Sequence, residues 1–466
     1  MLTDGRARRQ AAVPAGRSAG PSRPLRCTYP RDRRALERVQ RETALETTPV
    51  GAAVTAEPAP RISRWRHVAL GSFWFGNNFV TTPVYTILLQ LQVSQVIARD
   101  RQGFAIGLAT GIGGIFAMVL PPVVGALSDH LHTPWGRRRP LMVAGVLGVV
   151  LALIVMWNAN SYPPLLIGFV MVVAFINVCG GAYAGLIPDL VKGTEVGLAS
   201  GLLGLFVQLG SVASLLVTLV MSTSGQIRLT YGVIILVAIL SLLPTLWAAS
   251  REREMAVPER HRLSLREFVS PLWSGDFGWA FFTRFLNSSA FYVILPFLLL
   301  AFRDLFGIAN PGTITSLFEL IVTVVAVPCA IAGGLLSDRH GRKRFVYAAG
   351  ALQTLVLLLF LAGSSLPLTL VMVLGAVYGI GYGLYSSVDW ALGIDTLPDR
   401  DRPAKDLGLY HVADALPRVL LPLLVGGVLD VVNRTSPNAG YRTLFLFAAV
   451  LYAGGAILVS RIKSVR

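Results

Sequence analysis

Gly125-Ala-Leu-Ser-Asp129 is followed by Gly136-Arg-Arg-Arg139, and the chain repeats this pattern. The second copy is Gly334-Leu-Leu-Ser-Asp338, followed by Gly341-Arg-Lys-Arg344. This repeat is the strongest indication of the fold in the sequence. Both copies close a long apolar segment, and the two aspartates lie 209 positions apart. A charged loop repeated at half-chain spacing in an apolar chain indicates two similar bundles of membrane helices joined in tandem. Such an arrangement is typical of a carrier.

The composition independently indicates a membrane protein. Hydrophobic residues make up 54% of the chain and charged residues 14%, with a mean hydropathy of +0.62. A soluble protein has roughly a quarter charged residues, so this chain is expected to lie in a bilayer. The three cysteines, Cys27, Cys179 and Cys329, are far apart in the sequence. They suggest neither a disulfide framework nor a metal site, and we expect no cofactor.

Residues 1–62 differ from the rest of the chain and are predicted to form a disordered basic cytoplasmic tail. They are rich in Arg, Pro, Ala and Gly, and the chain up to Arg66 holds fourteen basic and six acidic residues. The tail has no apolar run long enough for a signal sequence or a span. It either contacts anionic lipid or a partner or is simply a solvated tail. Nucleic-acid binding is not expected, because the tail has almost no aromatic residues to stack on bases.

Hydropathy predicts twelve segments long enough to cross roughly 30 Å of hydrocarbon. They divide into an N-terminal six-helix bundle (63–250), a charged cytoplasmic linker (251–276) and a C-terminal six-helix bundle (277–466). The expected spans are 67–92, 104–127, 141–158, 165–188, 199–222, 230–249, 277–302, 312–336, 345–363, 368–393, 407–431 and 442–460.

The loop charges predict the orientation of the chain. Loops assigned to the cytoplasm hold nineteen Lys and Arg residues, and the opposite loops hold six. Because cytoplasmic loops carry the excess of basic residues, both termini are expected inside. Each half then begins and ends on the same side, so the two repeats are parallel, related by an axis along the membrane normal.

The repeated loop resembles the signature of the major facilitator superfamily, whose transporters have twelve helices in two pseudo-symmetric six-helix bundles. The first copy has the longer form that ends in Trp135-Gly-Arg-Arg-Arg-Pro140. This form resembles the glycoside and sucrose cation symporters. The resemblance implies an all-α membrane fold and alternating access to a solute site.

The repeated loops also supply a candidate cytoplasmic gate. Their arginines can contact lipid phosphate or the last carbonyls of the preceding helix. The resemblance implies that each aspartate faces an arginine and a helix start of the other half, near Gly408 for Asp129 and near Ala199 for Asp338, and so latches the inner gate while the carrier opens outward. The alternative is that the loops only anchor the topology. The candidate gate residues are Asp129, Arg137, Arg138, Arg139, Asp338 and Arg342.

Polar side chains within the spans are candidates for solute binding, because each is costly there unless it faces a cavity or a partner. Segments 67–92, 277–302 and 368–393 each carry amide, hydroxyl and aromatic groups at helical spacing. Such groups suit a sugar, whose hydroxyls need hydrogen bonds and whose C–H faces pack on rings. Interhelical bonding is an equally simple explanation for any one of them. The predicted substrate-binding residues are Asn78, Tyr85, Asn177, Gln208, Asn287, Tyr382 and Arg418.

Ionisable residues within the spans indicate where protons could couple to transport. His411, Asp414 and Arg418 lie on one face of segment 407–431. An arginine so deep needs a counter-charge, and we expect Asp414 and Glu319 to form a charge network with it. A salt bridge that never titrates is the alternative. The candidate proton-coupling residues are Glu319, Asp414 and Asp389.

These observations predict a secondary transporter that moves a sugar or similar small polar solute across the plasma membrane. We expect it to be coupled to H⁺ and to contact anionic lipid at its cytoplasmic loops. An efflux pump for hydrophobic compounds, a solute sensor without transport and uncoupled diffusion remain open. The chain shows no phosphate-binding loop and no Ser-His-Asp or Cys-His grouping, so an enzyme or ATP-driven pump is not expected. We expect a monomer.

Overall fold

Apolar segments surrounded by lipid must satisfy their own backbone hydrogen bonds, and helices do so within one segment. The computed structural model describes residues 63–131, 133–186, 190, 196–251, 265–398 and 403–464. Every regular element within these ranges is a helix, so the predicted all-α membrane fold is confirmed. The predicted tail, residues 1–62, and residues 252–264 of the predicted linker lie outside the described residues.

Eleven helices are long and apolar enough to cross a membrane within the described ranges. The first predicted span is a further helix, continuous from Arg64 to Val96. At 1.5 Å per residue it is about 50 Å long, which is enough to cross a membrane. Its amide side chains lower its mean hydropathy, and it is not among the eleven. The long helices are α2 (Arg64–Pro83), α4 (Gln102–Ser128), α5 (Arg139–Trp157), α6 (Tyr162–Ala184), α8 (Val196–Thr223), α9 (Leu229–Ala248), α11 (Asp276–Ile294), α13 (Pro311–His340), α14 (Arg342–Phe360), α15 (Leu368–Asp395), α16 (Pro403–Thr435) and α17 (Ala439–Leu458).

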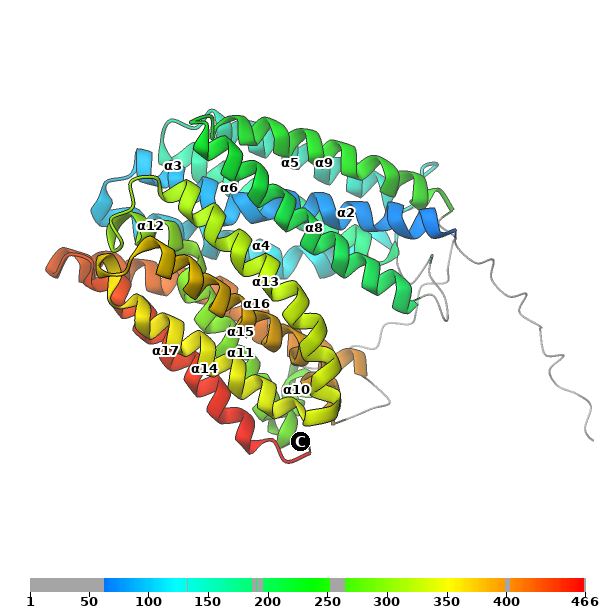
Figure 1. The fold of residues 1–466 in the computed structure, drawn as a ribbon. Helices are drawn as coiled ribbons and strands as arrows, with labels where there is room; N and C mark the ends of the chain where they lie inside the picture. The colour runs from blue at the N-terminus through cyan, green and yellow to red at the C-terminus, as the bar shows by residue number, and fades with distance from the viewer. Residues whose placement is uncertain are drawn as a thin grey trace, which may run out of the picture. The chain divides into compact units, whose positions relative to one another are not determined.

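The helices pack as two groups within residues 61–466. Helices α2 to α9, blue to green in Figure 1, contact one another, as do helices α11 to α17, which run to red. Two pairs of long helices make the most extensive contacts between the groups: α4 packs against α16, and α8 packs against α13. We call the groups the N bundle and the C bundle, and these two pairs the seams.

Proline changes the course of the first helix of each bundle. Pro83 ends α2, and a π-helical turn, η1 (Val84–Leu88), leads into α3 (Leu89–Val96). Pro296 lies in a 3₁₀ turn, η6 (Leu295–Phe297), between α11 and α12 (Leu298–Asp304). Proline lacks the N–H that would continue an α-helix, so both helices shift their hydrogen-bond register near the same end of the protein.

Hydrogen bonds join the bundles at this end, which we call the closed end (residues 90–103, 158–161, 222–228, 295–313 and 430–438). Gln90 bridges the break in the C bundle: its Nε2 donates to Leu295 O (3.3 Å), and its Oε1 accepts from Leu299 N (3.0 Å). Arg303 Nη2 donates to Gln102 Oε1 (2.7 Å). On the second seam, Ser222 and Thr313 share a hydroxyl bond of 2.9 Å.

The opposite end carries the repeated loops and is called the loop end. A Cβ atom built on Gly201 or Gly204 of α8, or on Gly334 of α13, would meet no atom within 4 Å. Ala199, at the start of α8, packs with Ala69, Leu70 and Ala248 of its own bundle. Within the described residues, hydrogen bonds between the bundles are thus found toward the closed end, and the seam helices have open space beside them toward the loop end.

The crossing of α2 and α8 leads to a stability prediction. A methyl group on Gly210 would clash with the backbone carbonyl of Phe75, and backbone cannot move aside as a flexible side chain can. We expect Gly210→Ala to destabilise the protein by about 1–3 kcal/mol, the usual cost of overpacking. Gly204→Ala, on the same helix but facing open space, is the matched control. Thermal unfolding of the purified protein in detergent would show whether Gly210→Ala alone lowers the Tm.

Candidate functional site

Three helices of the C bundle surround a buried ion pair. Arg284 Nη1 of α11 lies 2.9 Å from Asp389 Oδ2 of α15, and their side chains are only 7% and 11% exposed. The Arg284 guanidinium also lies over the rings of Trp390 and Tyr410, 4.7 and 4.6 Å from their centroids. The tyrosine hydroxyls of Tyr385 and Tyr410 donate to Asp389 Oδ1 at 3.1 and 3.2 Å. The carboxylate of Asp389 is therefore well satisfied, whereas Arg284 Nε has no hydrogen-bond partner among the described residues.

A second, more open ion pair lies on α16, one to two turns after Tyr410. Arg418 Nη2 lies 3.1 Å from Asp414 Oδ2, and their side chains are 44% and 22% exposed. Ser288 Oγ donates to Asp414 Oδ1 (2.8 Å), and Arg418 Nε donates to Tyr292 Oη (2.8 Å). Two polar side chains of α11 thus hold this pair. The expected contact between Arg418 and Asp414 is present.

Glu319 does not join that pair, so the predicted three-residue network is wrong. Its Oε2 instead accepts a hydrogen bond from Thr86 Oγ1 of the N bundle (2.8 Å). Depth can be counted from the closed end of each helix at 1.5 Å per residue. Glu319 lies about 12 Å from Pro311, and Arg418 lies about 25 Å from Thr435. Glu319 and Arg418 were expected at a similar depth. Helix α16 extends to Thr435, beyond the expected end at residue 431, and this places Arg418 deeper than Glu319. Glu319 is 8% exposed, and its Oε1 has no hydrogen-bond partner among the described residues.

Two of the predicted substrate-binding amides are hydrogen-bonded within their own helices. Asn78 and Asn177 each donate to a carbonyl of their own helix, Trp74 O (2.9 Å) and Val173 O (2.8 Å). Asn287 is buried, and its Nδ2 has no hydrogen-bond partner among the described residues. Gln208 is half-buried in α8.

Aromatic rings lie near the exposed ion pair. Tyr382 of α15 is 37% exposed and stacks on Phe291 of α11, with 5.6 Å between ring centroids and 20° between planes. Phe291 in turn meets Tyr292 edge-on at 5.3 Å. In the N bundle, Tyr85 contacts Phe169 edge-on at 5.1 Å. Tyr382 thus offers a partly open aromatic face close to hydrogen-bonding groups.

The repeated loops adopt matching local arrangements. Asp129 pairs with Arg138 of its own loop at 3.3 Å. Asp338 lies 3.7 Å from Arg342, which makes a closer pair with Asp395 at 2.7 Å. The predicted approach to Gly408 and Ala199 of the other half concerns a carrier that opens outward, and it stays a prediction. In this structure the printed partners of both aspartates are arginines of their own bundle.

The remaining gate candidates line the start of α5. Arg138 is buried, and its guanidinium occupies the place where a Cβ on Gly185, the C-cap of α6, would lie. Arg137 and Arg139 are half-buried beside it. The loop arginine therefore packs across the end of α6, much as Arg342 reaches Asp395 at the end of α15.

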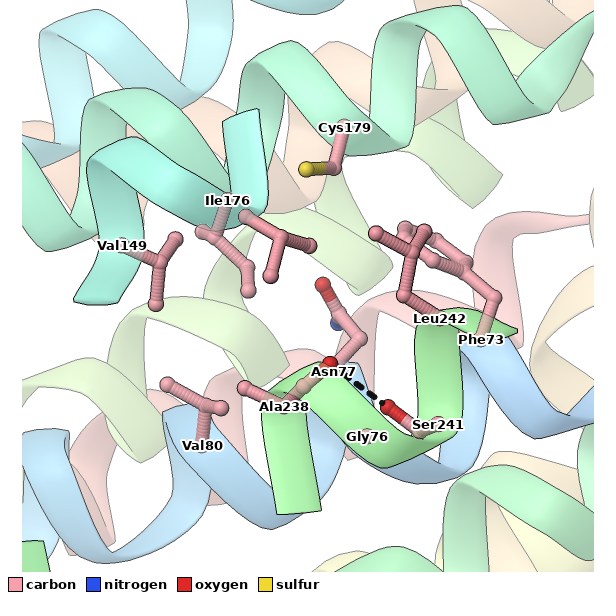
Figure 2. A pocket seen from close by; sticks show the side chains of 11 residues that line it. Phe73, Gly76, Asn77, Val80, Val149, Ile176, Cys179, Ala238, Ser241 and Leu242 are labelled. Carbon is pink, nitrogen blue, oxygen red and sulfur yellow. Dashed lines mark hydrogen bonds between the residues drawn. The ribbon is translucent and has the colours of Figure 1, made fainter. Parts of the chain in front are cut away.

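A small cavity in the N bundle cannot hold a solute of the proposed kind. It encloses about 10 Å³ between α2, α5, α6 and α9, and Figure 2 shows the Asn77 amide pointing into it among Phe73, Ile176 and Leu242. This is room for about one water molecule, whereas ligand pockets measure about 300–1,000 Å³. The partly exposed ion pair, and not this cavity, is the better candidate site.

Sequence reasoning missed several partners at the site. Tyr410 and Trp390 enclose Arg284, Tyr292 holds Arg418, and Thr86 binds Glu319. Tyr292 lies four residues after Ser288 on α11, so helical spacing would have placed both on one face. Nothing in the sequence signals Thr86 as the partner of Glu319, because they lie in different bundles.

Comparison with known proteins places this chain among transporters. The family model described as Major Facilitator Superfamily matches residues 68–402 and 280–465. An uncharacterized symporter of Synechocystis sp. is 26% identical over 177 residues, covering 34% of this chain and 32% of that protein. The multidrug resistance protein MdtG of Enterobacter lignolyticus is 26% identical over 54% of this chain and 59% of its own length. This chain thus spans about a third and three fifths of these relatives.

The relatives that match over more of this chain have lower sequence identity to it. The multi-drug resistance efflux pump PmrA of Streptococcus pneumoniae is 22% identical, covering 82% of this chain and 86% of that protein. A bacterial homologue of the human lysosomal transporter Spinster, solved inward-facing and unoccupied, has a TM-score of 0.66 at 14% identity, covering 86% of this chain and 97% of that chain. The nucleoside transporter NupG has a TM-score of 0.64 at 14% identity, covering 86% and 99%. The solved structures share the fold.

Proposed function

The chain belongs to the Major Facilitator Superfamily, and from that premise we propose that it moves a sugar or similar small polar solute across the membrane by proton-coupled alternating access. The exposed ion pair of Arg418 and Asp414 carries the proposal. Arg418 lies about 22 Å from the start of α16 at 1.5 Å per residue, near the middle of a membrane-spanning helix. A charged side chain exposed at that depth faces water or a solute and not lipid.

The chemistry around this pair suits a polyhydroxylated solute. Arg418 and Asp414 supply a donor and an acceptor, and Tyr382 presents a ring 37% exposed. Sugars use both kinds of contact, hydrogen bonds at their hydroxyls and packing at their C–H faces. The pair is neutral as a whole, which favours a neutral or zwitterionic solute over an anion. Membership of the glycoside and sucrose cation symporter branch belongs to the same proposal.

The orientation follows from the loop charges. The loop end carries Arg137 to Arg139 and Arg342 to Arg344, so by the positive-inside rule it faces the cytoplasm, where anionic lipid contacts it and both chain termini lie. The closed end then faces outward. On this assignment the structure is the inward-open state of a plasma-membrane carrier, which we propose to act as a monomer.

The proposal is tested by uptake of labelled disaccharides into proteoliposomes, with and without an imposed pH gradient. The expected result is accumulation that depends on the gradient and is absent from protein-free vesicles. The names of MdtG and PmrA make efflux of hydrophobic compounds the second candidate. Gradient-driven movement of a hydrophobic dye, with no sugar uptake by folded protein, would favour efflux. Solute binding without any movement would favour a sensor.

A further inference from the structure

Asp430 makes a contact between the bundles that the proposed transport site does not use. It lies near the C-terminal end of α16 and is 5% exposed. Its Oδ1 accepts a hydrogen bond from Gly103 N (2.9 Å) and its Oδ2 accepts one from Phe104 N (2.7 Å). Both N–H groups belong to the first turn of α4, in the other bundle. Such groups have no partner within their own helix, and the helix dipole favours an anion beside them.

Two glycines allow the carboxylate to reach the start of α4. A Cβ on Gly103 would lie 2.6 Å from Gly426 O and 2.7 Å from Asp430 Oδ1. A Cβ on Gly426 would clash in turn with the carbonyl of Gly103. The two backbones therefore touch directly at the closed end, and a side chain at either position would push α4 and α16 apart.

We propose that Asp430 is the latch that keeps this end of the protein shut. While the end is closed, Asp430 and the two N–H groups are away from water and satisfy one another. If Asp430 is removed, the N–H groups stay buried and unpaired in the closed state, which is unfavourable, but meet water in the open state. The two bonds thus stabilise the closed state selectively, as a latch must.

The neighbouring ion pair on the same seam is a weaker candidate for this role. Arg434 Nη2 lies 3.4 Å from Asp100 Oδ2, but the two side chains are 50% and 49% exposed. Exposed ion pairs contribute little to stability. The Asp430 contact is the buried one on this seam, and it uses a full charge against two backbone donors.

The latch is tested by the distance between spin labels at the closed end. Cysteines introduced at Asn160 and Ser436, exposed positions on the two bundles, carry the labels, with Cys27, Cys179 and Cys329 replaced by Ser. The unaltered latch is expected to give one short-distance population. Asp430→Asn is expected to raise the ratio of a longer-distance population to the short one about tenfold, the effect of losing a charge-assisted bond. Asp100→Asn, at the exposed pair, is the matched control and should leave the distribution unchanged.

A second variant keeps the test decisive. Gly426→Ala leaves the carboxylate in place but forces the backbones apart, and it is expected to shift the distances in the same direction. If folded, monodisperse Asp430→Asn and Gly426→Ala proteins both keep the native distribution, the latch is refuted. An equal shift in Asp100→Asn also refutes it, because the exposed pair would then hold the seam. The measurement needs no transported solute, so its outcome is separate from that of the uptake experiment.

Discussion

Glu319→Gln is expected to abolish solute accumulation driven by a pH gradient while leaving downhill exchange intact. Glu319 is buried, and its one identified hydrogen bond comes from Thr86 across the bundle interface. A buried carboxylate with so few partners is unfavourable when ionised. Separation of the bundles breaks this bond and admits water, which allows the proton to exchange. Glutamine keeps the shape of the protonated acid but has no proton to release.

The size of the effect follows from the gradient. One proton moved with each solute across a gradient of one pH unit supports about tenfold accumulation, since each tenfold ratio corresponds to about 1.4 kcal/mol. Accumulation by Glu319→Gln should fall to the level without a gradient. Glu319→Asp, which keeps an ionisable group, is the control and should retain part of the accumulation. Full gradient-driven uptake by Glu319→Gln would exclude this acid and leave Asp414 and Asp389 as the candidates for coupling.

Arg284→Ala is expected to cause a large loss of stability. It leaves Asp389 as an unpaired buried acid and removes the cation that lies over Trp390 and Tyr410. Removing one partner of a buried ion pair costs about 3–5 kcal/mol, so the Tm should fall on the order of 10 °C. The double variant Arg284→Met with Asp389→Leu should recover much of the loss, because no buried charge remains.

The exposed ion pair provides the matched comparison. Arg418→Ala also breaks an Arg–Asp pair of the C bundle, but Arg418 is 44% exposed, and exposed pairs contribute about 0–1 kcal/mol. Thermal unfolding in detergent should therefore separate the two variants, with Arg284→Ala far less stable and Arg418→Ala close to the native protein. Equal Tm values for Arg284→Ala and the native protein would show that the buried pair does not stabilise the fold.

The helical architecture was predictable because it depends on local properties of the chain. Apolar length defines a spanning helix, so the spans were found to within a few residues, as for 345–363 against Arg342–Phe360. The contact between Asp414 and Arg418 was predictable for the same reason, since residues four apart on a helix lie on one face. The breaks at Pro83 and Pro296 follow from the missing N–H of proline, although their π and 3₁₀ forms do not.

Contacts between distant segments were not predictable in this way. Two tandem bundles, their helices and the ionisable residues within the spans could be predicted from the residues alone, because hydropathy and helical spacing act over a few turns. The packed helices were needed to show that Glu319 meets Thr86 and not Arg418, that Asp129 pairs within its own loop, and that Asp430 caps α4. Each of these depends on how far a helix extends and on which end of the seams is closed. Helix packing determines both the helix lengths and the closed end, and no local sequence pattern predicts them.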